Sequence, residues 1–170
     1  MNTATSSFTP RAIVVGADGS EQSIAALELA AHLVPLAGDF LRAVTAWQYP
    51  IGFGTFAPVD WKPNELAENA LDHALSAAFQ DAPPCRVERR VLQGPAAQVL
   101  IDESEHALMV VVGSRGHGGF AGLLLGSVSS SVAERSACPV VIAHGSLRSR
   151  IQADESGCTS VADQVTTAPV

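Results

Sequence analysis

Glycines and a serine recur between residues 108 and 128 at a spacing suited to holding an anion. An unbroken apolar run, Leu108 to Val112, is typical of a strand buried on both faces. The pattern Gly113-x2-Gly116-x9-Gly126-Ser127 follows, and a helical stretch begins at Val128. Glycines let the backbone approach a ligand closely, and a helix N-terminus adds a positive dipole. Strand, glycine-rich loop and helix in this order favour a phosphate or nucleotide site.

The best-supported anion contacts in this segment are the Gly126 backbone and Ser127, which stands where a helix cap or a phosphate-facing hydroxyl would stand. A loop that uses its glycines only for flexibility is the alternative, and the residues alone leave both open. Arg115 and His117 fit either a phosphate contact or a solvated loop charge. Ser129 fits a phosphate contact less well than a place along the first helical turn.

Two common glycine motifs do not fit this chain. A Walker A loop needs a lysine after its last glycine, and the only lysine, Lys62, lies far from the loop. A dinucleotide-binding fingerprint forced onto Gly116 to Ala121 begins several residues after the strand. It also lacks a following strand that ends in an acidic residue. The sequence therefore favours a nucleotide site of another kind.

Strands and helices alternate along the chain. Apolar runs predict strands at Ala12–Val15, Phe40–Trp47, Val87–Leu92, Leu108–Val112 and Val140–Ala143, with Val87–Leu92 as an edge strand. Helical spacing predicts a first helix that Ser20 caps, that runs to about Leu33 and that Pro35 and Gly38 end. It also predicts helices over Asn64–Phe79 after Pro63, from Gly94-Pro95 to Ser104, and over Val128–Glu134.

This alternation predicts a parallel sheet with helices on both faces. Ligands bind such sheets at the carboxyl ends of the strands, where the strand order reverses. Asp18-Gly19-Ser20 ends the first strand and Gly113 ends the fourth. If these two strands are neighbours, a single crevice collects both turns.

Composition narrows the class of protein. The chain has 170 residues, 47% of them hydrophobic, which suits one domain with a real core. A net charge of -7 argues against nucleic acid as a partner. Three cysteines without a paired spacing, no signal-like N-terminus and no membrane-length apolar run indicate a cytoplasmic protein that contacts no membrane. We expect a flexible leader over 1–10, one domain over 11–144 and a disordered tail over 145–170.

Three motifs together resemble the universal stress protein family. They are IVVGADGS at the end of the first strand, the Gly-x2-Gly-x9-Gly-Ser pattern, and SACPVVIAH at the last strand. The resemblance covers roughly residues 11 to 143. It implies a three-layer α/β/α fold with a five-stranded parallel sheet in the order 3-2-1-4-5, similar to the adenine nucleotide alpha hydrolases. Family members that carry the glycine pattern bind ATP, so ATP is the expected ligand, with or without Mg²⁺.

The same resemblance implies a set of binding residues. It places Asp18 beside the adenosine, the backbone of Val44 against adenine, and the helix start at Gly126 around the phosphates. The full expected set is Ala17, Asp18, Val44, Val112, Gly113, Arg115, Gly116, Gly126, Ser127 and Val128. We expect no catalytic residue. We also expect no dedicated metal site, because the histidines lack metal-ligand spacing.

Three functions remain open on the sequence. The first is a stress-response or regulatory protein that binds an adenine nucleotide. The second is a slow ATPase or phosphotransferase, which has few charged groups for transition-state stabilisation. The third is a dimerisation module with an empty site. The apolar strand Val140–Ala143 at a sheet edge predicts a homodimer in which the last strands of two subunits meet.

Overall fold

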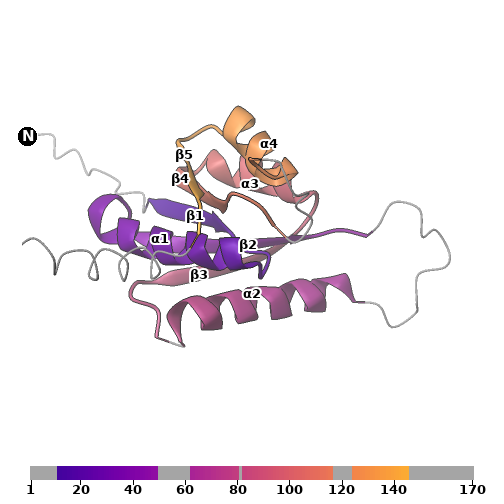
Figure 1. The fold of residues 1–170 in the computed structure, drawn as a ribbon, viewed down its shortest axis with the longest axis horizontal. Coiled ribbons are helices and arrows are strands. Elements are labelled where there is room, and N and C mark those ends of the chain that lie inside the picture. Colours follow the sequence, from indigo (N-terminus) through magenta and orange to yellow (C-terminus); the bar gives the residue numbers. More distant parts are fainter. Residues whose placement is uncertain (1–10, 50–61, 81, 117–123, 146–170) are drawn as a thin grey trace, which may run out of the picture.

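The computed structural model describes residues 11–49, 62–80, 82–116 and 124–145. Within these ranges five parallel strands form one sheet in the order β3-β2-β1-β4-β5, as the sequence predicts (Figure 1). Four helices join the strands. In chain order the elements are β1 Ala12–Gly16, α1 Glu21–Ala37, β2 Phe40–Trp47, α2 Pro63–Phe79, β3 Val87–Gln93, α3 Ala96–Ser104, β4 Ala107–Gly113, α4 Ser127–Arg135 and β5 Val140–Ala143.

Successive side chains of each strand point to opposite faces of the sheet, so the core has two halves. In β1, Ile13 and Val15 pack with residues of α1 and α2, whereas Val14 packs on the other face with residues of α3 and α4. In Figure 1 α3 and α4 lie together on one side of the sheet, with α2 on the opposite side. The result is the expected three-layer arrangement. None of the helices in the described ranges is long and apolar enough to cross a membrane.

The first helix is longer than the sequence predicts. Ser20 caps it as expected, its hydroxyl accepting a hydrogen bond from the Ser23 N–H at 3.2 Å. The predicted end near Leu33 is wrong, because α1 continues through Pro35 to Ala37. Proline removes only one helical hydrogen bond here, the one that an N–H at position 35 would donate to the Ala31 carbonyl.

The fourth helix begins one residue earlier than predicted. Its first residue is Ser127 and its N-cap is Gly126, so of the two roles predicted for Ser127 the cap is wrong and the phosphate-facing hydroxyl stays a prediction. The second helix also begins one residue early, with Pro63 in its first turn. Both differences are small, but the change at Gly126 alters which backbone groups are available to a ligand.

The strand order creates the predicted crevice. β1 pairs with β2 on one side and with β4 on the other, so the order reverses at β1. The turns after β1 and β4 leave the same edge of the sheet, and α1 and α4 follow them on opposite faces. This is the place where parallel α/β sheets bind ligands. The predicted leader and nearly all of the predicted tail lie outside the described residues, as do His117 and three glycines of the loop.

Candidate functional site

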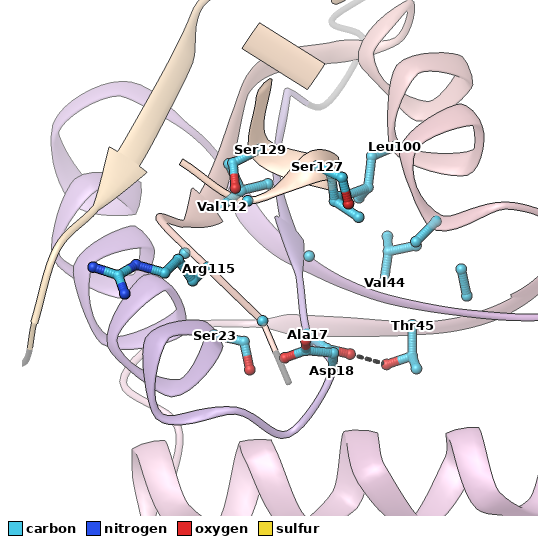
Figure 2. Close-up of a pocket in the computed structure, with 17 residues that line it drawn as sticks. Ala17, Asp18, Ser23, Val44, Thr45, Leu100, Val112, Arg115, Ser127 and Ser129 are labelled. Atoms are coloured by element: carbon cyan, nitrogen blue, oxygen red, sulfur yellow. Dashed lines mark hydrogen bonds between the residues drawn. The ribbon is translucent and has the colours of Figure 1, made fainter. Parts of the chain in front are cut away.

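A cavity of about 400 Å³ opens at the carboxyl ends of β1, β2 and β4 (Figure 2). This volume lies in the range of small-molecule sites. The structure brings together all ten residues that the sequence singled out, since each of them lines this cavity: Ala17, Asp18, Val44, Val112, Gly113, Arg115, Gly116, Gly126, Ser127 and Val128. Seven further residues that were not in the predicted set also line it: Gly16, Ser23, Thr45, Ala46, Ala96, Leu100 and Ser129.

One wall of the cavity is apolar. Val44 and Val112 form it from the sheet, and Leu100 forms it from α3. All three side chains are nearly inaccessible to solvent, and they belong to the same half of the core. Figure 2 shows Leu100 and Val44 on the same side of the cavity as Ser127. A flat aromatic ring would bury its faces against this wall without displacing any charged group.

The backbone of β2 meets the cavity at Ala46 as well as at Val44. The Val44 carbonyl accepts the Ala17 N–H at 2.9 Å, and Gly16 with Val44 is the last pair between β1 and β2. Two residues further, the N–H and carbonyl of Ala46 point to the same side as those of Val44, where β1 has already ended. Sequence reasoning missed Ala46. The end of the apolar run at Val15 was the signal that could have found it.

Thr45 fixes the turn that leaves β1. Its buried hydroxyl donates to the Ala17 carbonyl at 2.5 Å, which is the dashed line in Figure 2. Together with the bond from the Ala17 N–H, this ties both backbone groups of Ala17 to β2. The following residue, Asp18, is thereby held at the mouth of the cavity.

Asp18 is oriented by the start of α1. Its Oδ1 accepts hydrogen bonds from the Ser20 N–H at 3.0 Å and the Ser20 hydroxyl at 2.6 Å. A Cβ placed on Gly116 would collide with Asp18 Oδ2, so a glycine at that position makes room for the carboxylate. Arg115 lines the cavity with an exposed side chain. In Figure 2 its guanidinium extends away from Ser127.

The N-terminus of α4 lies at the end of the cavity opposite Asp18. The Gly126 N–H already donates to the Ser114 carbonyl at 2.8 Å, and contact between the Gly126 backbone and an anion stays a prediction. Within the described part of the chain, no side chain caps this helix. The first-turn amides of Ser127, Val128 and Ser129 and the exposed Ser127 hydroxyl therefore remain as the donors that could hold an anion.

Ser129 braces the loop. Its buried hydroxyl donates to the Ser114 carbonyl at 3.0 Å, beside the bond from Gly126. Two hydrogen bonds thus fix the carbonyl of Ser114 to the first turn of α4. This agrees with the interpretation of the Ser129 hydroxyl as a structural group rather than a phosphate ligand.

The glycines of the pattern differ in what the fold demands of them. A Cβ on Gly113 would lie 2.7 Å from the backbone carbon of Gln22, so the packing of α1 excludes a side chain there. A Cβ on Gly126 would meet no described atom closer than 3.4 Å, which is ordinary contact. Gly126 has a φ of -75°, which any residue adopts. The described fold therefore does not require glycine at position 126.

Fold and cavity together define a doubly wound α/β protein with a cavity at the point where the strand order reverses. Residues 10–144 match the sequence model of the Universal stress protein family. The chain is 35% identical over 136 residues to a universal stress protein of Mycobacterium tuberculosis, and 38% identical over 133 residues to one of Mycolicibacterium smegmatis. The chain belongs to the universal stress protein family.

The extent of these matches differs between relatives. The two alignments cover 79% and 76% of this chain but only 46% and 44% of the relatives, so the chain spans less than half the length of these proteins. A solved universal stress protein in complex with cAMP is 29% identical, with a TM-score of 0.55. That match covers 81% of this chain and 98% of the other chain.

Proposed function

We propose that this chain binds an adenine nucleotide in the cavity, with ATP as the preferred ligand, and acts as a stress-response or regulatory binding protein. The observation that carries the proposal is the presence of a glycine at position 126. The described fold would accept a side chain there, yet a glycine stands at the N-terminus of α4 in the wall of the cavity. A phosphate group seated on the first turn of α4 supplies the reason for a position without a side chain.

The rest of the cavity fits the other parts of a nucleotide. The apolar wall of Val44, Val112 and Leu100 suits the base, and the Ala46 backbone offers hydrogen bonds at its edge. Asp18 lines the same cavity, and its carboxylate suits hydrogen bonds from ribose hydroxyls. The relative whose structure contains cAMP supports an adenine ligand in the same fold.

We propose binding rather than efficient catalysis. Phosphoryl transfer needs several groups that stabilise charge, together with a positioned nucleophile. Among the described residues that line the cavity, Asp18 and Arg115 are the charged side chains. In this proposal Mg²⁺ would enter only with the nucleotide. We also propose a cytoplasmic location, because Cys85 and Cys138 are free thiols in the structure.

Calorimetric titration tests the proposal directly. We expect saturable binding of ATP at one site per chain, weaker binding of cAMP and adenosine, and no binding of GTP at the same concentration. Mass spectrometry of ligand released by heat from gently purified protein identifies what the site holds. Protein that carries no ligand and binds none of these compounds would refute the proposal and favour an empty dimerisation module.

Asp18→Asn is expected to weaken adenosine and ATP alike, by about tenfold. Asparagine keeps a carbonyl oxygen that can accept both hydrogen bonds from Ser20, so the turn before α1 should persist. The charge that would accept hydrogen bonds from ribose hydroxyls is lost. Titration of both ligands measures the change. Loss of affinity for ATP alone would show that Asp18 acts through a cation at the phosphates, contrary to this assignment.

We further propose that the protein is a homodimer that joins the β5 strands of two subunits. The two edges of the sheet differ in character. β3 carries Glu88, Arg89 and Arg90 in its centre, whereas β5 consists of four apolar residues, Val140 to Ala143. Charges on an edge strand discourage pairing with another chain, and an apolar edge invites it. The β5 edge is therefore the better candidate for the interface.

A further inference from the structure

Four charged side chains form a closed ring between α3 and the sheet. Glu103 of α3 accepts hydrogen bonds from Arg42 of β2 and from Arg90 of β3, each at 3.1 Å. Glu88 of β3 accepts from the same two arginines, at 3.2 Å and 2.9 Å. Each arginine thus contacts both glutamates. This charge ring, Arg42, Glu88, Arg90 and Glu103, has no net charge.

The ring is buried where α3 meets it. The side chains of Arg42 and Glu103 are only 13% and 12% exposed. Burial alone would raise the pKa of Glu88, but hydrogen bonds from Arg90 and Arg42 outweigh it and lower that pKa below its usual value. The hydrogen bond to Glu88 in turn raises the pKa of Arg90. Both shifts favour the charged forms of Glu88 and Arg90.

Apolar residues of the same size would stabilise such a position at least as well, because desolvation offsets much of the attraction in a buried ion pair. What hydrogen-bonded charges add is geometry: the arginine forks fix distance and direction. Glu103 is the member of the ring that α3 contributes. Its two hydrogen bonds link this helix to β2 and to β3.

On both β2 and α3, the residues of the ring lie close to residues that line the cavity. Along β2, Arg42 precedes Val44 by two residues and shares its face of the sheet. Along α3, Glu103 follows Leu100 by three residues and shares its side of the helix. Val44 and Leu100 form the apolar wall of the cavity, and Ala96 at the start of α3 also lines it. Val99 and Leu100 also pack α3 into the core, and Ser104 accepts a hydrogen bond from the Ala137 N–H, so Glu103 is the contact that ties α3 to β2 and β3 by charge.

We propose that the charge ring positions α3, and with it the apolar wall of the cavity, so that the ring sets the affinity for the nucleoside part of the ligand. The proposal rests on nucleotide binding in this cavity. None of the four side chains lines the cavity. They are positioning residues, which act through Leu100 and Ala96.

Glu103→Gln tests the ring by removing one charge and leaving a side chain of equal size. Adenosine and ATP should both lose about tenfold in affinity, with the ratio of their affinities unchanged, since the phosphate end is untouched. Amide hydrogen exchange should accelerate in α3 and stay the same in α1 and α2. Asp72→Asn is the matched control, because it breaks an exposed pair between α2 and Arg89 of β3, away from α3.

The outcomes separate the two proposals. Unchanged adenosine affinity in folded Glu103→Gln overturns the role of the ring, as does an equal loss in Asp72→Asn. If the wild-type protein binds no adenine nucleotide, the proposed function fails. In that case amide hydrogen exchange still tests the ring without a ligand. If exchange in α3 stays as slow in Glu103→Gln as in the wild type, the ring does not position this helix. Should Glu103→Gln fail to fold, Arg90→Gln, at a side chain 40% exposed, gives the same readouts.

Discussion

Replacing Gly126 by valine is expected to weaken ATP binding about a hundredfold while the protein remains folded. A Cβ at this position meets no described atom closer than 3.4 Å, and the backbone there suits any residue. Because Gly126 lines the cavity as the N-cap of α4, we expect the larger valine side chain to crowd a phosphate at the first-turn amides. An overpacked contact costs about 3 kcal/mol, which corresponds to about a hundredfold in affinity.

Calorimetric titration with ATP measures this loss, and thermal unfolding followed by circular dichroism reports the fold. Gly113→Ala is the informative control, because its Cβ would lie 2.7 Å from the backbone of Gln22. That variant should lose stability, since α1 must shift, whereas Gly126→Val should keep most of it. Wild-type affinity in a folded Gly126→Val protein would remove the N-terminus of α4 as the phosphate site.

The architecture could be predicted because its signals are local and repeated. Apolar runs such as Val140–Ala143 mark strands whatever their neighbours, and alternation with helices leaves few sheet topologies. The prediction that β1 and β4 lie side by side is confirmed by their pairing from Ala12 to Val15. The family resemblance added the strand order, which the apolar pattern alone does not contain.

The features that the sequence did not predict depend on tertiary contacts. Pro35 is an ordinary helix terminator in sequence, but α1 packs on the sheet and continues past it to Ala37. The sequence also does not reveal that the Gly126 amide donates to the carbonyl of Ser114, twelve residues earlier. Ala46 becomes a candidate for base recognition only once the register shows that β1 ends opposite Val44. The binding role of all ten predicted residues stays a prediction that titration must test.

Val141→Lys is expected to convert the proposed dimer into a monomer. β5 lies at the edge of the sheet, and Val141 is half-buried at its centre. In a dimer that pairs two β5 strands, lysine side chains from both subunits would approach one another across the seam. Their charges would be desolvated without partners, which is costly, and like charges on opposing strands repel.

A change at Val141 also touches the core, because this side chain packs against the cluster shared with α1. Val91→Lys controls for that effect. Val91 is a half-buried residue of the other edge strand, β3, and packs against the same cluster. Both variants should lose similar packing, so both should show a similar decrease in thermal stability.

Only the lysine at position 141 should change the assembly. Light scattering should give the mass of one chain, 17.6 kDa, for Val141→Lys and twice that mass for the wild type and for Val91→Lys. Circular dichroism should retain the helical signal in all three proteins. Because the apolar β5 edge is the basis of the proposal, a dimer that persists in folded Val141→Lys would show that the subunits meet at another surface.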